Sequence, residues 1–202
     1  MICVLNYGSG NVGSVYNVLK FLGYNVIISN NKTDIQNASH LILPGVGAFK
    51  SSMKKINDSI PLDILEKEVI KNGKPFLGIC VGMQVLANRG DEGGVSMGLG
   101  WIPGVIEKIK TDKAPLPHIG WNNIKVTKET EVFNGLKAIN DFYFVHSYAF
   151  FGVVEENILA KVEYETSIVA AVNKDNIYGV QFHPEKSQRA GQVILKNFLN
   201  IS

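Results

Sequence analysis

Apolar and polar positions alternate with two different periods along the first half of the chain. Four continuous apolar runs are typical of strands buried on both faces: residues 2–7, 24–29, 40–45 and 75–80. Between these runs, residues 12–23 and about 48–72 carry apolar side chains at helical spacing, with a break expected at Pro61. Strands that alternate with helices predict a parallel sheet covered by helices on both faces.

Short β-rich segments dominate the second half of the chain. They are residues 104–109, 123–127, 142–148, 158–164, 167–173 and 177–183. Residues 173–176 fit a hairpin loop, and a last helix is expected from about Gly191 to Leu199. The pattern predicts one α/β domain over residues 1–202, with a mostly parallel central sheet flanked by helices and antiparallel later strands.

Composition narrows the class of protein. With 46% hydrophobic and 19% charged residues, the 202-residue chain has the balance of a folded globular protein. The net charge of +2 and the scattered basic residues give no indication of a nucleic-acid partner. The first residues lack the pattern of a signal peptide, and no apolar run is long enough to cross a bilayer. We therefore expect a cytoplasmic protein with no membrane partner and with reduced cysteines.

The strongest chemical signal is GICVG, residues 78–82, where a buried strand ends and helical spacing begins. A nucleophile on such a strained turn needs small flanking residues, which Gly78 and Gly82 supply for Cys80. The start of a helix favours the thiolate, and the N–H of Val81 is placed to donate to an oxyanion. The alternative is a buried structural cysteine that has two glycines nearby by chance.

A thiol nucleophile needs a base, and His183 has the expected surroundings. It ends a predicted strand and is followed by Pro184 and Glu185. Proline keeps the preceding residue extended, and the carboxylate can accept from one imidazole nitrogen while the other faces the thiol. The alternative is that these three residues form an ordinary polar loop.

The other histidines and Cys3 have different surroundings. His40 is expected to be structural or on the surface, His118 falls in a loop rich in proline and glycine, and His146 falls in a predicted strand. Cys3 is expected to be a buried strand residue without a catalytic role. Two separated cysteines and four dispersed histidines do not have the spacing of a zinc site, so we expect neither a metal nor a cofactor.

Residues 43–49, LPGVGAF, come at the end of another predicted strand. Gly45 and Gly47 let backbone N–H groups approach a ligand closely, as the second half of an oxyanion hole requires. A glycine-rich turn is the alternative. This segment, Cys80 and His183 each lie at the C-terminal end of a predicted strand, which is where open α/β sheets bind their ligands.

These motifs resemble those of the class I (triad) glutamine amidotransferases, with GICVGMQ as the nucleophile motif and FHPEKS as the His-Glu motif. Within that class, NYGSGNVGSV, LPGVGAF, LPHIGWN, FYFVHSY and GVQFHPEKSQ are most similar to one family. That family is the glutaminase subunit of imidazole glycerol phosphate synthase, from histidine biosynthesis. The match runs from Asn6 to Phe198 and implies the same fold.

The resemblance implies a mechanism for these residues. Cys80 would attack the side-chain amide of glutamine, with His183 as base and then acid and with Glu185 orienting His183. Ammonia would leave, and the glutamyl thioester would be hydrolysed to glutamate. The resemblance also implies an oxyanion hole and glutamine pocket made by Gly45, Val46, Gly47, Val81, Gln84, Ser147 and Tyr148.

The resemblance further implies a partner, because ammonia must not escape to water. A separate barrel-fold synthase (cyclase) subunit would receive it and close the imidazole ring of a phosphorylated precursor, so a heterodimer is expected. Five residues in matching motifs fall near the expected docking face: Asn11, Trp121, Asn122, Tyr143 and Lys186. Trp121 fits an interface anchor, with a core tryptophan as the alternative.

Residues 50–53, 85–98 and 148–152 depart from the histidine-pathway pattern. They leave a second acceptor open, in which a paralogous glutaminase subunit supplies ammonia for amidino-sugar formation in surface glycans. Two other classes fit less well. A non-catalytic domain on this fold is expected to lack the Cys, His or Glu of the motifs, and a related cysteine hydrolase usually has its histidine where Val81 stands.

Overall fold

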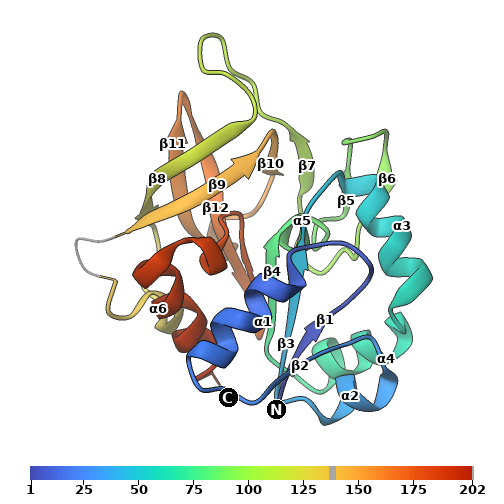
Figure 1. The fold of residues 1–202 in the computed structure, drawn as a ribbon. Coiled ribbons are helices and arrows are strands. Elements are labelled where there is room, and N and C mark those ends of the chain that lie inside the picture. The colour runs from blue at the N-terminus through green and yellow to red at the C-terminus, as the bar shows by residue number, and fades with distance from the viewer. Residues whose placement is uncertain (137–139, 202) are drawn as a thin grey trace.

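The computed structural model describes residues 1–136 and 140–201, which form two sheets (Figure 1). The strands of the larger sheet are β1 (Ile2–Leu5), β2 (Val26–Ser29), β3 (His40–Gly45), β4 (Phe76–Cys80), β8 (His118–Val126), β9 (Asp141–His146), β11 (Ile158–Tyr164), β12 (Thr166–Lys174) and β13 (Ile177–Val180). Those of the smaller sheet are β5 (Arg89–Gly90), β6 (Ser96–Met97), β7 (Val105–Lys108) and β10 (Tyr148–Phe151).

The larger sheet consists of a parallel half and an antiparallel half. Its strand order is β2-β1-β3-β4-β13-β12-β11-β8-β9. Pairing is parallel from β2 to β13 and antiparallel from β13 to β9. All residues of β1 and β4 are buried, as their continuous apolar runs predict. The expected α/β architecture, with parallel early strands and antiparallel later ones, is confirmed.

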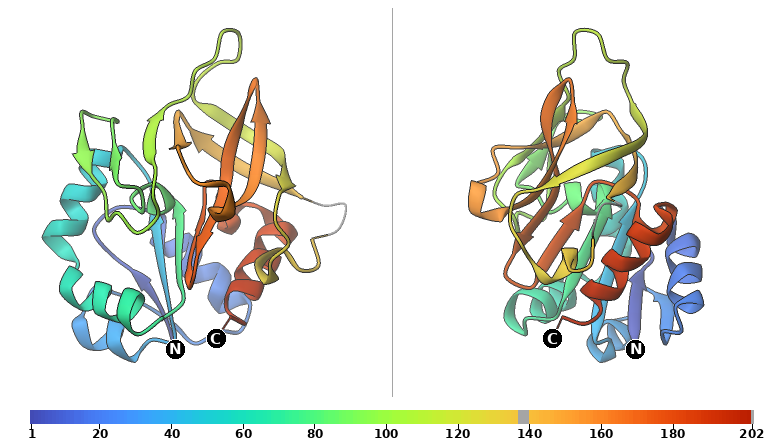
Figure 2. Two further views of the ribbon diagram at one scale, coloured as in Figure 1. Left: turned by 180° about the vertical axis from the view of Figure 1, so that it is seen from behind. Right: turned by 90° about the vertical axis from the view of Figure 1, so that its left-hand side faces the viewer.

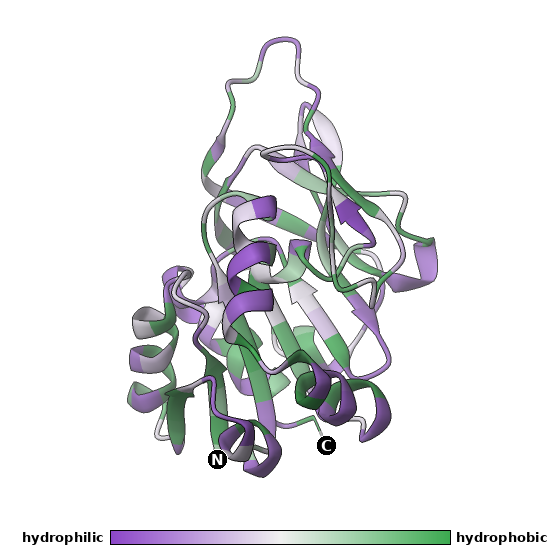
Figure 3. Cartoon of the chain, turned by 90° about the vertical axis from the view of Figure 1, so that its right-hand side faces the viewer, coloured by the Kyte–Doolittle hydropathy of each residue, from purple (hydrophilic) through white to green (hydrophobic). Residues whose placement is uncertain are grey.

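Helices cover both faces of the parallel half (Figures 1 and 2). The helices are α1 (Val12–Phe21), α2 (Lys32–Asn37), α3 (Phe49–Ser59), α4 (Leu62–Glu66), α5 (Val81–Gln84) and α6 (Gln188–Phe198). α1 and α6 lie on one face, whereas α3 and α4 lie on the other. The break expected at Pro61 separates α3 from α4. Figure 3 shows apolar strands at the centre and polar residues on the helices around them. In the described chain, no helix combines the length and apolar character that crossing a membrane requires.

The strand that contains His118 is longer than predicted. β8 begins at His118 rather than at Asn123, because it pairs with β9 along this whole stretch, starting with His118 opposite His146. Pro117 before the strand and Gly120 within it conceal this pairing in the sequence pattern. The expectation that His118 lies in a loop is therefore wrong, since a cross-strand partner decides the conformation.

Other boundaries also differ from the prediction. The strand expected over residues 142–148 ends at His146, and Tyr148 begins β10 in the smaller sheet. α2, β5 and β6 are too short to produce a periodic signal and were not predicted. The last helix begins at Gln188 rather than at Gly191. Cys3 is buried in β1 and unpaired, and His40 contacts the backbone oxygen of Ile201, so both structural expectations are confirmed.

Glycines let α5 pack directly against the ends of the parallel strands. A Cβ atom at Gly82 would overlap the carbonyl oxygen of Leu43 in β3. One at Gly78 in β4 would overlap the carbonyl oxygen of Gly82. Because the overlapping atoms are backbone atoms of β3 and α5, neither overlap can be relieved by a side-chain rotation, and only glycine fits.

Replacing Gly82 by alanine should therefore lower the free energy of unfolding by about 1–3 kcal/mol or more. Gly13, in α1, has open space around its Cβ position, so Gly13→Ala should leave stability unchanged or raise it by up to about 1 kcal/mol. Urea unfolding of both variants measures the contrast. Equal effects of the two substitutions would contradict the packing argument.

Candidate active site

The ends of three adjacent parallel strands bring the predicted chemistry together. Gly45, the last residue of β3, pairs in register with Cys80, the last residue of β4. On the other side of β4, strand β13 ends at Val180, opposite Ile79. The segment after β13 carries His183. Residues that are far apart in the sequence therefore meet at one edge of the sheet.

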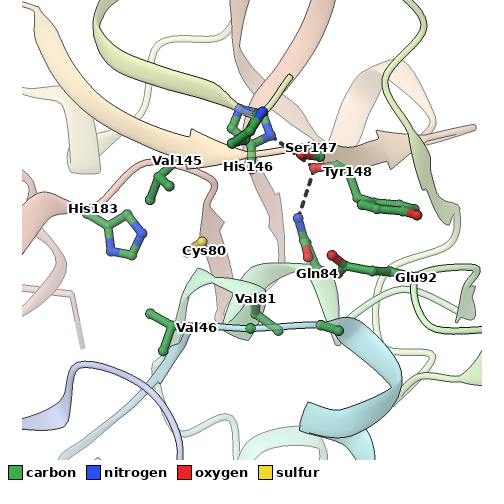
Figure 4. Close-up of a pocket in the computed structure, with 13 residues that line it drawn as sticks. Val46, Cys80, Val81, Gln84, Glu92, Val145, His146, Ser147, Tyr148 and His183 are labelled. Carbon is green, nitrogen blue, oxygen red and sulfur yellow. Dashed lines mark hydrogen bonds between the residues drawn. The ribbon is translucent and has the colours of Figure 1, made fainter. Parts of the chain in front are cut away.

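A cavity of about 420 Å³ lies at this edge (Figure 4), a size suited to a small-molecule ligand. Eight of the predicted site residues line it: Val46, Gly47, Cys80, Val81, Gln84, Ser147, Tyr148 and His183. Five residues that were not predicted also line it: Ala48, Glu92, Pro117, Val145 and His146. Gly45 and Glu185 lie behind this lining rather than in it.

Cys80 has the backbone conformation of a nucleophile elbow. Its φ is +56° and its ψ is −114°, a region that residues other than glycine rarely adopt. The close packing at Gly78 and Gly82 holds this turn in place. α5 contains only the four residues Val81–Gln84, so the helix expected after the elbow is short. The side-chain amide of Gln181 also contacts the sulfur, with Gln181 Nε2 3.7 Å from Cys80 Sγ.

His183 and Glu185 form a buried pair beside Cys80. His183 Nδ1 lies 2.8 Å from Glu185 Oε1, and both side chains are almost completely buried. Within the described residues, His183 Nε2 has no hydrogen-bond partner and faces the cavity (Figure 4). Burial by itself lowers the pKa of His183, but the neighbouring Cys80 and Glu185 side chains outweigh it and raise the pKa to about 10. The imidazole is therefore protonated at neutral pH.

The position of His183 depends on backbone contacts with β9. Its N–H donates to the carbonyl oxygen of Tyr143 at 2.9 Å. The hydroxyl of Ser187 donates to the carbonyl oxygen of His183 at 2.7 Å and accepts from the N–H of Tyr143 at 3.0 Å. This closed set of bonds ties the segment after β13 to the antiparallel half of the sheet.

His146 has the opposite electrostatic character. His146 Nδ1 lies 2.9 Å from the carbonyl oxygen of Tyr148, and its Nε2 lies 3.0 Å from His118 Nδ1. Burial lowers the pKa of His146 to about 4, so the ring stays neutral. A carbonyl oxygen only accepts, so Nδ1 carries the proton. His146 therefore holds the Tyr148 carbonyl in place at the wall of the cavity.

The glycine-rich segment after β3 lies at the mouth of the cavity. Val46 is half-exposed, and Gly47 has a φ of +102°, where other residues are strained. The hydroxyl of Ser9 donates to the carbonyl oxygen of Val46 at 2.9 Å. One hydrogen bond from a separate loop thus constrains the peptide on which the second half of an oxyanion hole would depend.

Three of the predicted interface residues form an exposed aromatic cluster close to His183. Trp121 is 48% exposed, so the alternative of a core tryptophan is wrong. Its ring meets that of Tyr143 edge-on at a centroid distance of 6.1 Å, and the ammonium of Lys186 lies 5.4 Å from the Tyr143 ring centre. Tyr143 is also a neighbour of the His183 ring, at 6.5 Å.

The other two predicted interface residues point elsewhere. Asn11 Nδ2 lies 3.4 Å from Glu185 Oε1, so Asn11 contacts the His-Glu pair. Asn122 follows Trp121 in β8 and donates to the backbone oxygen of Glu163 at 3.0 Å. Successive strand residues face opposite sides of a sheet, so Asn122 does not belong to the aromatic cluster.

Comparison with known proteins agrees with this geometry. Residues 3–201 match the family "Glutamine amidotransferase class-I". The chain is 44% identical to the imidazole glycerol phosphate synthase subunit HisH 2 of Methanococcus maripaludis, over 98% of both chains. It is 41% identical to the HisH 1 subunit of Campylobacter jejuni over the full length of both. The chain belongs to the class-I glutamine amidotransferase family.

Solved structures support the fold of this amidotransferase. A crystal structure of a glutamine amidotransferase has a TM-score of 0.73 and 19% identity, covering 98% of this chain and 96% of its own. The PurLQS structure from Thermotoga maritima gives a TM-score of 0.74 and 17% identity, covering 98% and 97% of the two chains. The predicted family, fold and enzyme class of the amidotransferase are thus confirmed.

Two polar residues of the amidotransferase site were not predicted, Glu92 in the cavity lining and Gln181 behind it. Gln181 is fully buried between Gln84 and Cys80. Glu92 is the one carboxylate among the thirteen lining residues, and burial raises its pKa. An amide inside an otherwise apolar strand end must find buried partners, so the glutamine in IYGVQF was the available signal for Gln181. No group of three or more metal-ligating side chains occurs in the described ranges 1–136 and 140–201.

The two histidines of the cavity should titrate in opposite directions from the ordinary value of 6.5 in an NMR experiment, with midpoints near 10 for His183 and near 4 for His146. The stability contributed by His183 is complete below pH 6.5 and is lost as the pH rises towards 10. That contributed by His146 is complete above pH 6.5 and is lost as the pH falls towards 4. Glu185→Gln should lower the midpoint of His183 alone. Two midpoints near 6.5 would contradict this assignment.

Proposed function

We propose that this amidotransferase is the glutaminase subunit of a cytoplasmic imidazole glycerol phosphate synthase, acting as a single domain over residues 1–202. It hydrolyses glutamine to glutamate and ammonia and passes the ammonia to a barrel-fold synthase subunit in a heterodimer. One observation carries the proposal: full-length identity of 41–44% to HisH subunits combined with a strained Cys80 that shares a cavity with a protonated His183.

In the proposed reaction, the Cys80 thiol gives its proton to His183, and the thiolate Sγ bonds to the side-chain amide carbon of glutamine. The imidazolium of His183 gives its Nε2 proton to the amide nitrogen, the C–N bond breaks, and ammonia leaves. His183 then takes a proton from water, whose oxygen attacks the thioester carbon. The C–S bond breaks, glutamate leaves, and the Cys80 thiolate and the His183 imidazolium are restored. Glu185, 2.8 Å from Nδ1, keeps the imidazole oriented and stabilises its positive charge.

The negative oxygen of the tetrahedral intermediate needs donors beside Cys80. Val81 directly follows the nucleophile, and Gly45 pairs with it in register. We propose that the N–H of Val81 and one N–H of the segment Gly45–Gly47 form the oxyanion hole. The bond from Ser9 to the Val46 carbonyl holds one orientation of this segment, and the conformational freedom of Gly47 suits a peptide rotation when the partner is engaged.

The cavity wall supplies groups for the rest of the glutamine molecule. Gln84 Oε1 is buried without a partner among the described residues, so it is available to accept from an N–H of the substrate. Ser147 and Tyr148 also line the cavity, and the Tyr148 carbonyl accepts from Gln84 Nε2 at 3.0 Å (Figure 4). We propose that the Glu92 carboxylate receives the α-ammonium group, because a bound cation would offset the cost of its burial.

The proposed partner binds over the aromatic cluster of Trp121, Tyr143 and Lys186. A half-exposed tryptophan backed by a tyrosine and a lysine has the composition of an interface hot spot. Asn11 and Asn122, the other two residues expected at the docking face, contact Glu185 and Glu163 instead. A barrel seated here would cover the His183 end of the cavity and keep ammonia from water.

A second acceptor is kept for one specific reason. Residues 50–53, 85–98 and 148–152 depart from the histidine-pathway pattern. We therefore keep the alternative of a paralogous glutaminase subunit that supplies ammonia for amidino-sugar formation in surface glycans. The site chemistry is identical in the two proposals, and only the barrel partner differs.

Cys80→Ser should abolish glutamine-dependent synthesis in the complex while leaving synthesis from added ammonium intact, because the hydroxyl is not ionised by His183. Glu185→Gln should lower kcat for glutamine by on the order of 10²–10⁴-fold. Glutamate release and product formation are measured separately for each complex. Loss of ammonium-dependent synthesis in the serine variant would mean that docking, rather than chemistry, had been damaged.

Glutamate release by the chain should rise by roughly ten- to a hundredfold when the histidine-pathway barrel is added together with its aminoimidazole substrate. The barrel of an amidino-sugar pathway should give no such increase. Cys80→Ser assayed with each barrel provides the background rate. Stimulation by the second barrel alone would support the alternative acceptor. If no glutamate is released with either barrel, both proposed functions are contradicted.

A further inference from the structure

A fully buried amide connects the glutamine pocket to the nucleophile. Gln181 directly follows β13, and its backbone N–H donates to the carbonyl oxygen of Ala170 at 2.8 Å. Its side chain lies between two polar groups. Gln181 Oε1 is 3.0 Å from Gln84 Nε2, and Gln181 Nε2 is 3.7 Å from Cys80 Sγ. The mechanism proposed above assigns this residue no role.

The carbonyl oxygen of Tyr148 decides which end of each side-chain amide, in Gln84 and in Gln181, is oxygen and which is nitrogen. The carbonyl oxygen of Tyr148 can only accept, and it lies 3.0 Å from the end of the Gln84 side chain, so that end must be Nε2. The same nitrogen also contacts Gln181, which must therefore present its oxygen to Gln84. If either amide were rotated, two donors or two acceptors would face each other in a buried site. Gln181 thus presents its NH₂ group to Cys80.

The Tyr148 carbonyl is held by His146, which is in turn held by His118. His146 Nδ1–H donates to the Tyr148 carbonyl at 2.9 Å, and His146 Nε2 accepts from His118 Nδ1–H at 3.0 Å. These bonds require the His146 ring to be neutral, which agrees with its lowered pKa; burial also lowers the pKa of His118. A hydrogen-bonded chain therefore runs from His118 through His146, the Tyr148 carbonyl, Gln84 and Gln181 to the sulfur.

We propose that Gln181 is a positioning residue whose N–H donates to the Cys80 thiolate and directs it into the glutamine cavity. This inference rests on the proposed glutaminase function. A bond from a neutral N–H to a charged sulfur is stronger than one to a thiol, so the contact favours the reactive form. It also resists rotation of the Cys80 side chain away from the cavity. Gln84 supports the arrangement by fixing which end of the Gln181 amide meets the sulfur.

The test measures alkylation of Cys80 by iodoacetamide between pH 5 and pH 10 in the full-length chain with Cys3→Ser, so that Cys80 is its only cysteine. Gln181→Met keeps the length of the side chain and removes the donor. Gln181→Glu keeps its shape and replaces the donor by an acceptor. The substitution Gln36→Met makes the same chemical change at an exposed position of α2 and is the matched control.

Gln181→Met should slow alkylation at pH 6 by about three- to tenfold and move the pH midpoint of labelling upward. Gln181→Glu should produce a larger shift, and Gln36→Met none. Glutamine hydrolysis with the partner should fall through kcat, with KM nearly unchanged, because the amide does not line the cavity. The titratable neighbours His183, Glu185, His146, Tyr7 and Glu92 are the same in all variants, so their effects cancel in the comparison.

Each outcome decides between a positioning role and simple space filling. Unchanged pH profiles for both Gln181 variants would overturn the inference, even if thermal unfolding shows lower stability. If Gln181→Met fails to fold, the isosteric Gln181→Glu alone decides through its midpoint. Failure of the proposed function has a different signature, since wild-type chain with the partner would then release no glutamate although Cys80 is alkylated with the expected pH dependence.

Discussion

The parallel register of β3, β4 and β13 is the constraint on which the site depends. Main-chain hydrogen bonds place Gly45 opposite Cys80 and bring the end of β13 to the other side of the nucleophile strand. Slipping one strand by a residue would exchange its two faces and move Gly45 out of register with Cys80. The glycines below α5 complete it, since they let the backbone after Cys80 turn back onto β3 without a Cβ in the way.

Burial acts in opposite ways on the two histidines of the cavity because their partners differ. His183 faces Cys80 and Glu185, whose side chains outweigh burial and raise its pKa, which favours the imidazolium. His146 faces a carbonyl oxygen and another imidazole, which supply hydrogen bonds but no compensating charge. Charge is thus concentrated on one side of the nucleophile, and on the other side neutral dipoles fix geometry. The same residue type serves chemistry in one place and support in the other.

The sequence was sufficient to predict structure and site residues where the local residue pattern and the chemistry of the residues agree. Buried parallel strands, the elbow at Cys80 and the polar residues after β13 each have a short-range signature, so the fold class and most of the cavity lining could be predicted. His118 was misplaced because only its cross-strand partner His146 shows that it belongs to a strand. Gln181 and Glu92 were missed for a related reason. Their importance depends on neighbours about 100 and 40 residues away in the sequence, which no local pattern reveals.

Residue spacing along the chain also sets an order in time. Cys80 and its elbow are complete once β3 and β4 have been made, whereas β13, His183 and Glu185 come about a hundred residues later. Since β13 pairs directly with β4, this edge of β4 stays open until residues 177–180 have left the ribosome. A truncated or half-synthesised chain therefore has the nucleophile without the base that activates it. The nucleophile therefore gains its base only when β13 has paired with β4.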